Sequence, residues 1–450
     1  MLLLDVLYVA AFIVLSPWIL AMIIFRPSFR AGIGARFRPA LHAEPSRPTV
    51  WLHGSSAGEI DLLRALAGQV ETLPGDYRIV ISAFAVSGYT AAKKAFPQHT
   101  VIYFPVDFSP VVRRFLRVIQ PKLIVLVESE LWPNFIATSD RAGIPVCVVN
   151  ARMSEKSFRG HRRLPLIPWA LRKLSMLAAQ TTEDAARFRS LGVADDRLHV
   201  TGNMKYDLCE TGNADEILGL RRRLRTRYGV AEETPVVIGG SLHRGEDKAF
   251  AWAYKRLLDA GQELCLVLVP RYPAEAPAMV SELEQIGLVG VLKSGLSDEE
   301  KAVFEDHSHV LVVDTIGELR RLYTMADIAY VGGSLHYRGS NKGGHNLMEP
   351  AVLGTAVLFG PHNYSFRETV RDLLEAGAGK LVYDQDELLA SLTQLLDDPE
   401  SRKEIGRRAR RVVLDNRGAA SQNLRLLRDY LPSGGVCSDS HTNEGIPIQS

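Results

Sequence analysis

The chain of 450 residues is too long for one ordinary domain, so we expect two domains of about 150–200 residues each. Its hydrophobic fraction of 46% is typical of a folded globular protein, and its net charge of +2 gives no case for a nucleic-acid partner. The four cysteines lie far apart, with no CxxC pair and no histidine at metal-ligand spacing, which indicates buried thiols in a reducing compartment: Cys147, Cys209, Cys265 and Cys437.

An uncharged apolar segment, residues 6–25, stands near the start of the chain and is long enough to cross a bilayer. Four arginines follow it directly, and the positive-inside rule then places the rest of the chain in the cytoplasm: Arg26, Arg30, Arg36 and Arg38. A cleaved signal peptide would carry its positive charge before the apolar core, so we interpret residues 1–26 as an uncleaved membrane anchor. Asp5 and Pro17 weaken this span, and a monotopic helix lying in the membrane interface is the alternative.

Short apolar runs alternate with helical stretches rich in alanine and charge after the anchor. Alternation of this kind predicts an α/β fold with parallel sheets, whose ligands bind at the carboxyl ends of the strands. In the first half of the chain the predicted strands are 50–53, 78–82, 101–104, 123–127, 146–149 and 198–200. In the second half they are 236–239, 264–269, 310–313, 328–331 and 356–359.

These elements predict two doubly wound, Rossmann-like domains that face a cleft, at residues 27–212 and 231–432. An arginine-rich segment without a strand pattern, residues 213–230, is expected to link or border the two domains. The last residues, 433–450, are mostly polar and are expected to form a disordered tail.

Charged side chains at predicted strand ends are the chemical candidates in the first half of the chain. Glu59 opens a helix soon after the first strand, where a carboxylate could accept a proton from an alcohol as general base. A first-turn glutamate that favours the helix dipole is the commoner alternative. Glu128 and Glu130 end a buried strand, although one of them could simply be solvated. Lys205 follows a later strand and could neutralise an anionic substrate, or could be a solvated surface lysine.

Two glycine clusters, Gly332-Gly333-Ser334 and Gly343-Gly344, stand between a predicted strand and an apolar, helix-like run. Glycines in such a place let the backbone approach a phosphate, and the N-terminus of a helix offers unpaired N–H groups. Asn346 and Glu349 are three residues apart, so on a helix they would share one face and could bind the paired hydroxyls of a ribose. A nucleotide site and a plain glycine-rich turn with a capped helix are both consistent with this segment.

Three more loops end strands in the second half. Pro270 and Arg271 end one strand, which places a guanidinium where a phosphate or a base could meet it. The loop 315–319 ends another, and its backbone could recognise the edge of a base. Ser241 ends a third as a plausible N-cap of the next helix. Because all of these loops lie at carboxyl ends of strands, together they predict one nucleotide site.

Signatures of other transfer chemistries are missing from the sequence. The one Asp-x-Asp pair is Asp384 and Asp386, and Asp386 is expected to cap the helix that follows. The sequence contains neither a Walker loop nor a GxSxG elbow. Phosphoryl transfer and acyl-serine chemistry are therefore not predicted, and no metal ion is expected.

The motifs, taken in order and at rough spacing, resemble those of a known family. They are WLHGSSAGE at 51–59, ESELWPN at 128–134, NARMS at 150–154, TGNMKYD at 201–207, PRYP at 270–273, TIGEL at 315–319 and the two glycine clusters. The chain resembles the 3-deoxy-D-manno-octulosonic acid (Kdo) transferases, which attach Kdo to lipid A precursors. The resemblance extends from the anchor to about residue 416. It implies the GT-B fold, in which the first domain binds the acceptor and the second binds the sugar nucleotide.

The resemblance also implies a role for each site residue. Glu59 would be the base that deprotonates the acceptor hydroxyl. Glu128 and Lys205 would stabilise a transition state with positive charge on the sugar and negative charge on the departing CMP. The donor, CMP-Kdo, would be held by Pro270, Arg271, Ile316, Gly317, Glu318, Asn346, Leu347, Met348 and Glu349. Neither a metal nor another cofactor is implied, and direct displacement would invert the anomeric centre of Kdo.

A membrane location follows from the resemblance, at the inner membrane with the catalytic domains on the cytoplasmic side. Residues 152–173 are basic and yet contain apolar side chains, which suits a phosphorylated glycolipid in an anionic membrane surface. A solvated helix face is the alternative. The basic residues of this segment are Arg152, Lys156, Arg159, Arg162, Arg163, Arg172 and Lys173.

The sequence departs from the family pattern in three places. The spacer 335–342 between the glycine motifs is twice as long as usual, Tyr272 stands where a histidine is usual, and residues 54–57 differ from the common serine-valine sequence. None of these departures removes a proposed catalytic residue. Two alternatives stay open: a GT-B enzyme that uses another activated sugar, and a catalytically silent membrane-bound binding protein.

Overall fold

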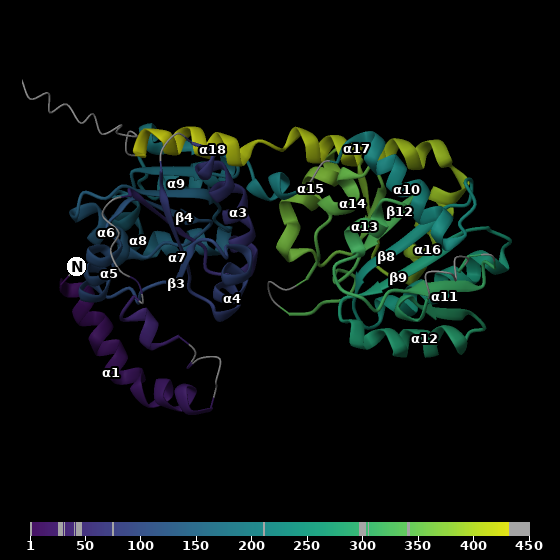
Figure 1. Cartoon of the computed structure of the whole chain (residues 1–450), viewed down its shortest axis with the longest axis horizontal. Helices are drawn as coiled ribbons and strands as arrows, with labels where there is room; N and C mark the ends of the chain where they lie inside the picture. Colours follow the sequence, from purple (N-terminus) through teal and green to yellow (C-terminus); the bar gives the residue numbers. More distant parts are fainter. Residues whose placement is uncertain are drawn as a thin grey trace, which may run out of the picture. The chain divides into compact units, whose positions relative to one another are not determined.

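A computed structural model of the chain describes residues 2–25, 30, 32–39, 41, 47–73, 76–209, 212–296, 303–304, 306–339 and 343–431. The chain forms two compact units (Figure 1). The first unit comprises Met1–Leu208 and Arg417–Ser450, and the second comprises Cys209–Asn416. The predicted tail at 433–450 lies outside the described residues.

The first unit is built on a parallel sheet of seven strands in the order β3-β2-β1-β4-β5-β6-β7. Their bounds are β1 Thr49–His53, β2 Arg78–Ala83, β3 Thr100–Tyr103, β4 Pro121–Val127, β5 Val146–Ala151, β6 Met176–Ala179 and β7 Leu198–Val200. The chain moves outward from β1 to β3 on one side and returns to β4 on the other, so the topology reverses between β1 and β4. Ligands of doubly wound sheets bind outside the carboxyl ends of the strands at such a reversal.

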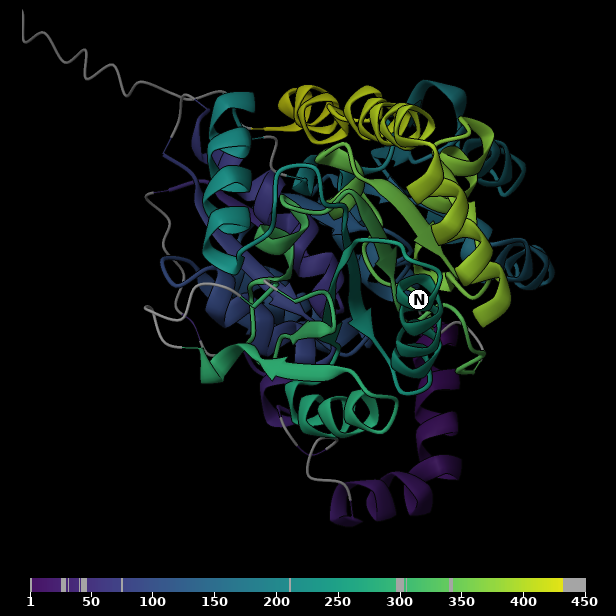
Figure 2. The same cartoon turned by 90° about the vertical axis from the view of Figure 1, so that its right-hand side faces the viewer.

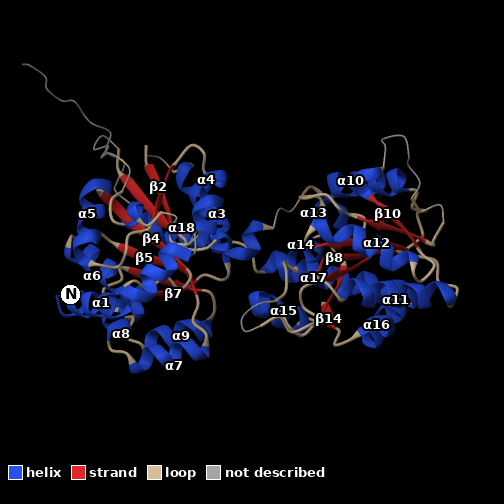
Figure 3. Cartoon of the chain, turned by 90° about the horizontal axis from the view of Figure 1, so that it is seen from below, coloured by secondary structure: helices blue, strands red, loops and turns tan. Residues whose placement is uncertain are grey.

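Helices cover both faces of this sheet (Figure 3). They are α3 Ala57–Glu71, α4 Val86–Ala95, α5 Ser109–Ile119, α6 Pro133–Arg141, α7 Glu155–Arg163, α8 Leu166–Leu171, α9 Thr182–Ser190 and α18 Ala419–Leu427, with the 3₁₀ turns η1 Gly34–Arg36, η2 Asp195–Arg197, η3 Met204–Leu208 and η7 Arg428–Tyr430. Successive residues of a strand face opposite sides. Val50 and Leu52 accordingly enter one core with α3 and α18, while Trp51 enters the other with α5 and α6. Burial on both faces explains why these strands are continuous apolar runs.

The second unit repeats the architecture with the strand order β10-β11-β9-β8-β12-β13-β14. The strands are β8 Val236–Leu242, β9 Cys265–Pro270, β10 Val289–Leu292, β11 His309–Val312, β12 Ile328–Val331, β13 Ala356–Phe359 and β14 Gly379–Leu381. The helices are α10 Ala214–Tyr228, α11 Glu246–Asp259, α12 Ala276–Glu284, α13 Leu319–Tyr323, α14 Met348–Val352, α15 Arg367–Glu375, α16 Gln385–Asp397 and α17 Pro399–Asp415, with the 3₁₀ turns η4 Pro273–Glu275, η5 Lys293–Gly295 and η6 Tyr364–Phe366. Here the topology reverses between β8 and β12.

The units differ from the predicted boundaries at two places. The segment predicted as a linker, 213–230, contains the helix α10 and belongs to the second unit. Two of its arginines are structural: Arg221 Nη2 lies 2.6 Å from Asp327 Oδ1, and Arg225 donates to Asp327 and to three backbone carbonyls. The last helix, α18, returns to the first unit, where its Leu424 joins the core around α3.

The strands β6, β10 and β14 were not predicted, because each is only three or four residues long and β10 and β14 contain a glycine. Two predicted helix caps are corrected by the structure. Ser241 lies inside β8 and is not an N-cap, and α11 begins after Gly245 without a side-chain cap. The cap of α16 is Asp384, which accepts a hydrogen bond from the backbone N–H of Glu387, and not Asp386.

The predicted anchor forms a single helix, α1 Leu2–Phe25, with Pro17 inside it. Figures 1 and 2 both show this helix leaving the body of the first unit and bending partway along, as a proline inside a helix causes. Within the residues that the structure describes, no helix is both long enough and apolar enough to cross a membrane, so the predicted transmembrane helix is not found.

Asp5, which interrupts the apolar sequence of α1, attaches the start of this helix to the folded unit. Its Oδ1 accepts hydrogen bonds from the Ser109 backbone N–H and from Asn134 Nδ2, both at 3.0 Å. One turn later the Tyr8 hydroxyl donates to Asp107 Oδ2 at 3.1 Å. Burial raises the pKa of Asp107 to about 6, despite hydrogen bonds from the backbone N–H groups of Asn134 and Phe135. The polar start of α1 is therefore bound to the carboxyl-end side of the sheet, while most of its described apolar side chains are exposed.

Candidate functional site

The predicted acidic residues of the first unit gather at the reversal between β1 and β4. Glu59 lies in the first turn of α3, directly after the turn that ends β1. Glu128 and Glu130 follow β4. Their charges act on one another, because Glu130 and Glu128 both raise the pKa of Glu59. The three glutamates therefore lie together at the carboxyl end of the sheet.

Glu59 caps its own helix with one carboxylate oxygen, and its other oxygen takes no part in the cap. In a capping box, Ser56 accepts from the Glu59 backbone N–H, and Glu59 Oε2 accepts from the backbone N–H groups of Ser56, at 3.1 Å, and of Ser55. In the part of the chain that the structure describes, Oε1 has no hydrogen-bond partner. Burial raises the pKa of Glu59 to about 7, with further contributions from Glu130 and Glu128 that outweigh the two backbone bonds. A carboxyl group with a pKa near the working pH is suited to act as a general base.

Glu128 and Lys205 form an ion pair at the same edge. The Lys205 Nζ atom lies 3.5 Å from Glu128 Oε1, and Arg152 Nε lies 2.9 Å from Glu128 Oε2. Glu128 is buried, and its negative charge is balanced by two cations, one at each carboxylate oxygen. Arg152 comes from the end of β5. In the sequence it belongs to the NARMS motif and to the basic segment, and its pairing with Glu128 was not predicted.

The backbone of this cluster adopts conformations that side chains rarely take. Glu128 has φ +59° and Asn150, at the end of β5, has φ +54°. Left-handed φ is common for asparagine but costly for glutamate, and such residues persist where the surroundings hold them. The Glu128 backbone N–H donates to the Val149 carbonyl at 3.0 Å, and Asn150 Oδ1 accepts from the Met204 backbone N–H at 2.8 Å, one residue before Lys205. These two hydrogen bonds hold the unusual backbone conformations and so fix the positions of Glu128 and Lys205.

A second pair, Glu130 and His53, was missed by sequence reasoning. His53 ends β1 and is fully buried; its Nε2 lies 3.3 Å from Glu130 Oε2, and its Nδ1 contacts Ser82 Oγ at 3.0 Å. Trp132 Nε1 donates to the same Glu130 oxygen at 2.7 Å. Burial favours a raised pKa for Glu130, but hydrogen bonds from His53, Trp132 and Ser55 outweigh burial and leave the pKa below its ordinary value. Glu130 is thus held as a charged neighbour of Glu59 and is not a solvated side chain.

The segment that carries Lys205 is held by the helix that returns from the far end of the chain. Asp207 Oδ1 accepts from the Gly418 backbone N–H at 2.6 Å, and Oδ2 accepts from the Ala420 backbone N–H at 2.7 Å. The Thr201 hydroxyl donates to Asn423 Oδ1 at 3.2 Å. Helix α18 and Gly418 before it therefore hold the segment containing Lys205 in place.

In the second unit the first glycine cluster is organised by a buried carboxylate, Glu246, at the start of α11. Its Oε2 accepts from the backbone N–H groups of His243, at 2.9 Å, and Gly333, at 2.7 Å. Its Oε1 accepts from the backbone N–H groups of Ser334 and Leu335 and from the Tyr330 hydroxyl. These N–H groups are already bonded within the protein. The predicted phosphate cradle at this turn is therefore corrected: its amides bind Glu246.

The second glycine cluster packs against the segment that follows β13. Gly343 has φ +136°, and a Cβ there would lie 2.2 Å from the His362 carbonyl oxygen. Gly344 has φ +76° and donates its N–H to the Gly333 carbonyl at 2.7 Å. These glycines are required by backbone packing and by left-handed φ, independently of any ligand.

Asn346 and Glu349 are neighbours, but not on one helical face. Helix α14 begins only at Met348, so Asn346 precedes it and accepts from the Met348 backbone N–H at 3.1 Å. Asn346 Nδ2 donates to Glu349 Oε1, also at 3.1 Å. Burial raises the pKa of Glu349, although this hydrogen bond and the charge of Arg320 oppose the rise. The predicted common helical face is therefore wrong, because a capping turn before α14 brings the two side chains together. The adjacent Leu347 and Met348 are buried.

The remaining donor-site candidates lie at carboxyl ends of strands, as predicted. Arg271 follows Pro270 at the end of β9, and its guanidinium lies 5.6 Å from the Tyr272 ring centre. In the loop after β11, Ile316 is 87% exposed and Gly317 has φ +88°. Glu318 Oε1 in this loop is bound by Lys293 Nζ at 2.7 Å and by the Thr315 hydroxyl at 2.6 Å. The exposed part of the loop that remains for a ligand is its backbone and Ile316.

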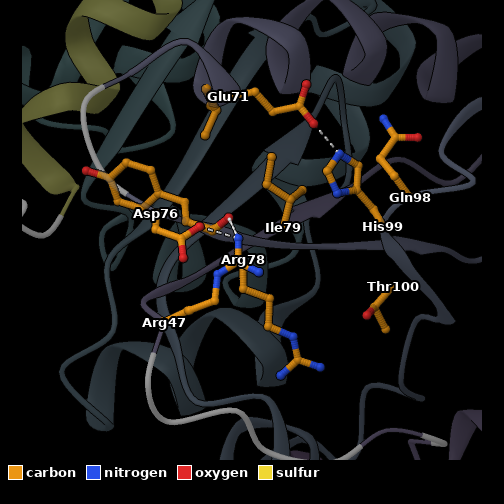
Figure 4. A pocket seen from close by; sticks show the side chains of 10 residues that line it. Arg47, Glu71, Asp76, Arg78, Ile79, Gln98, His99 and Thr100 are labelled. Atoms are coloured by element: carbon orange, nitrogen blue, oxygen red, sulfur yellow. Dashed lines mark hydrogen bonds and ion pairs between the residues drawn. The ribbon is translucent and has the colours of Figure 1, made fainter.

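A polar pocket of about 320 Å³ lies elsewhere, at the amino ends of β2 and β3 (Figure 4). Arg47 pairs there with Asp76, and His99 Nε2 lies 2.6 Å from Glu71 Oε1. This is the opposite end of the sheet from Glu59, and these charges are already paired. We assign no substrate to this pocket.

Among the described residues, no group of three or more histidine, cysteine, aspartate or glutamate side chains is arranged to hold a metal ion, and the absence of a metal from the reaction stays a prediction. Cys147, Cys209 and Cys265 are buried free thiols, as predicted, and Cys437 lies outside the described residues. Burial raises the pKa of Cys265 to about 12, which makes this thiol unreactive.

Comparisons with known proteins agree with this architecture. Residues 31–208 match the family described as 3-deoxy-D-manno-octulosonic-acid transferase (kdotransferase), and residues 294–412 match glycosyl transferases group 1. A 3-deoxy-D-manno-octulosonic acid transferase of Haemophilus influenzae is 30% identical over 434 residues, which cover 94% of this chain and 98% of that protein. A transferase of the same name from Bordetella pertussis is 31% identical over 418 residues, covering 91% and 92%.

Solved structures show the same fold at low sequence identity. The UDP-GlcNAc 2-epimerase of Neisseria meningitidis superposes with a TM-score of 0.56 at 13% identity, covering 85% of this chain and all of that one. The MnaA protein of S. aureus superposes with a TM-score of 0.52 at 12% identity, covering 85% and 96%. The predicted fold class, two Rossmann-like domains of the GT-B type, is confirmed.

Proposed function

The chain belongs to the 3-deoxy-D-manno-octulosonic acid transferase family, and from this premise we propose that it transfers Kdo from CMP-Kdo to a lipid A precursor. It is a glycosyltransferase that acts in lipopolysaccharide synthesis. The observation that carries the finer proposal is the constellation of Glu59, Glu128 and Lys205 at the carboxyl edge of one sheet. Each of these residues matches a motif of the family.

Glu59 is the proposed base. A hydroxyl of the acceptor must lose its proton as the new glycosidic bond forms. The Oε1 oxygen of Glu59 is available for this proton, since the capping bonds use Oε2. With its pKa raised to about 7, a large fraction of Glu59 is ionised at neutral pH and is basic enough to accept the proton.

Glu128 and Lys205 are the proposed electrostatic partners of the transition state. Kdo transfer builds positive charge on the sugar ring and negative charge on the departing CMP. A buried carboxylate and an adjacent ammonium, 3.5 Å apart, can each oppose one of these charges without reorganising. Arg152 keeps Glu128 charged when Lys205 turns toward an anion, because it binds the other Glu128 oxygen.

The second unit is proposed to hold the CMP part of the donor. Arg271, the backbone of the loop at Ile316–Glu318 and the hydrogen-bonded Asn346–Glu349 pair are the groups that would contact it. A half-buried glutamate such as Glu349, which already accepts from the Asn346 amide, can accept from a ribose hydroxyl with its second oxygen. Transfer is proposed to proceed without a metal and with inversion at the anomeric carbon of Kdo.

The acceptor is proposed to reach the site from a membrane surface. The exposed apolar side chains of α1, among them Ile13, Val14 and Phe25, suit a monotopic helix that lies in the membrane interface. The docking of Asp5 and Tyr8 binds the start of this helix to the sheet edge that carries Glu59. The basic helix α7 adds charges that attract an anionic inner-membrane surface on the cytoplasmic side.

The proposed function is tested by mass spectrometry of the lipid product. Detergent-solubilised protein is incubated with CMP-Kdo and a tetraacylated lipid A precursor. The lipid should gain the mass of one or more Kdo units. A well-folded protein that binds CMP and transfers nothing would contradict the lipid A acceptor, and a protein that does not bind CMP would contradict the donor.

A further inference from the structure

Two histidines from distant segments form a pair at the carboxyl end of β8. His243 follows this strand, and His345 follows the second glycine cluster. Their Nε2 atoms lie 2.9 Å apart and their rings are stacked, with centroids 5.2 Å apart and planes at 11°. At this distance one Nε2 donates and the other accepts, so the pair holds one proton between the two nitrogens.

The pair is fixed in place by the groups behind it. Glu246 accepts from the His243 backbone N–H, and the same carboxylate fixes the glycine turn at Gly333. The ring of His345 packs on that turn, because a Cβ at Gly333 would lie 2.9 Å from its Cδ2. Tyr272 places its ring edge-on to His243, with centroids 5.8 Å apart. The pair can thus change its proton content without moving its backbone.

The charged groups that face the pair are Arg271, Arg338 and Glu246. The two arginines together lower the pKa of each histidine by more than the charge of Glu246 raises it. Burial and the charges of His243 and Arg271 together lower the pKa of His345 to about 4, and burial also lowers the pKa of His243, so the pair carries no net charge at neutral pH. An arriving anion would reverse this balance, because it attracts both the arginines and an additional proton.

We propose that the His243–His345 pair receives the phosphate of the sugar nucleotide and takes up one proton as it does so, an inference that rests on the proposed donor. The added proton breaks the contact between the two Nε2 atoms, since both then carry hydrogen, and each Nε2–H donates to a phosphate oxygen. During transfer the bond between the Kdo anomeric carbon and a phosphate oxygen breaks. Its electron pair stays on that oxygen, and the imidazolium faces the charge that develops there. The proton returns to solvent when CMP leaves.

Calorimetry of CMP binding tests this proposal. CMP is titrated at pH 7.5 in two buffers with different ionisation enthalpies, and the difference in binding heat gives the number of protons taken up. We expect uptake approaching one proton with CMP and none with cytidine, which lacks the phosphate. This comparison uses the wild-type protein and does not depend on any variant.

Glutamine variants then locate the proton. His345→Gln and His243→Gln each keep a donor but cannot become charged, so uptake should vanish and CMP binding should weaken roughly ten- to hundredfold, with cytidine binding unchanged. His309→Gln, at the amino end of β11, serves as the control and should keep both properties.

The outcomes separate this inference from the function on which it rests. CMP binding by wild type without proton uptake, or uptake that persists in both variants, would overturn the role of the pair and leave the donor assignment standing. A wild-type protein that binds no CMP would overturn both.

Discussion

At the strand reversal of the first unit three glutamates converge, and each has only part of its hydrogen-bonding capacity filled. At the reversal of the second unit a single glutamate, Glu246, is surrounded by five donors. Both clusters lie at the carboxyl end of a seven-stranded parallel sheet, at the point where the strand order reverses. The difference therefore arises from the loops and not from the scaffold.

The number of donors around each carboxylate decides what it can do. Glu59 shares one oxygen with two backbone N–H groups and has its pKa raised to about 7 by burial and by its neighbours, so it can exchange a proton. Glu246 has both oxygens occupied, and its role is to hold the glycine turn and His243 in place. We infer that Glu59 in the first unit provides the base of the transfer step, while Glu246 in the second unit fixes the loops around the proposed phosphate site.

The largest expected effect is a loss of kcat without a loss of CMP affinity when Glu59 in the first unit is replaced. Glu59→Gln removes the base and preserves a side chain that can still accept from Ser55 and Ser56. We expect kcat to fall by about 10²–10⁴-fold, the range in which general-base catalysis contributes. CMP affinity should not change, because the donor groups lie in the second unit. Asp61→Asn, an exposed acid on the same helix, is the matched control, and equal losses in both variants would contradict the assignment.

Removal of the organising carboxylate should instead destabilise the second unit. Glu246→Ala leaves four buried backbone N–H groups without an acceptor, so we expect the free energy of unfolding to fall by about 3–5 kcal/mol. Tyr330→Phe removes one of the five donors and should cost only about 1 kcal/mol. Urea denaturation of the two variants measures the contrast. Similar small losses in both would mean that Glu246 does not organise the turn.

The scaffold and the position of each reactive group could be predicted from local sequence. Continuous apolar runs mark strands buried on both faces, and the residue that follows such a run must emerge at the carboxyl edge. This placed Glu59, Glu128 and Arg271 without any tertiary information. The short edge strands β10 and β14 were missed because Gly290 interrupts the first, and Gly379 and Lys380 leave the second with one apolar residue.

The contacts that could not be predicted all join segments far apart in the chain. Glu246 meets Ser334 across 88 positions, and Asp207 meets Gly418 across 211. The sequence around Glu246 or around Asp207 gives no local signal of such a distant partner. The same holds for α10, whose arginines pair with Asp327 and so belong to a domain, although their density alone suggested a linker.

A charge reversal on the surface of the first unit should weaken use of the lipid acceptor without changing CMP binding in the second unit. Arg162→Glu with Arg163→Glu places two acids at the exposed end of α7, next to the proposed membrane surface. We expect the apparent KM for lipid acceptor in anionic vesicles to rise on the order of tenfold, with CMP affinity unchanged. Lys93→Glu with Lys94→Glu, on the exposed side of α4, makes the same charge change elsewhere on the first unit. An equal rise in both double variants would mean that net charge, and not α7, recruits the lipid.

The smallest effect concerns how Glu130 adjusts the base. Glu59 must be ionised to accept a proton, so the rate should fall as the pH drops below its pKa of about 7. Glu130→Gln removes a negative charge that favours the protonated form, so the pKa of Glu59 should decrease and the acidic limb of the pH–rate profile should move to lower pH.

A shift of up to about one pH unit is expected, which means that the variant loses less of its rate than wild type between pH 7 and pH 6. Glutamine keeps an oxygen to accept from Trp132, so the local packing should survive. Glu71→Gln, at the opposite edge of the sheet, should leave the limb where it is. If the acidic limb of the pH–rate profile does not move in Glu130→Gln, the pKa that it reports belongs to a group other than Glu59. Glu59 would then not be the acid–base group that distinguishes the first unit from the second.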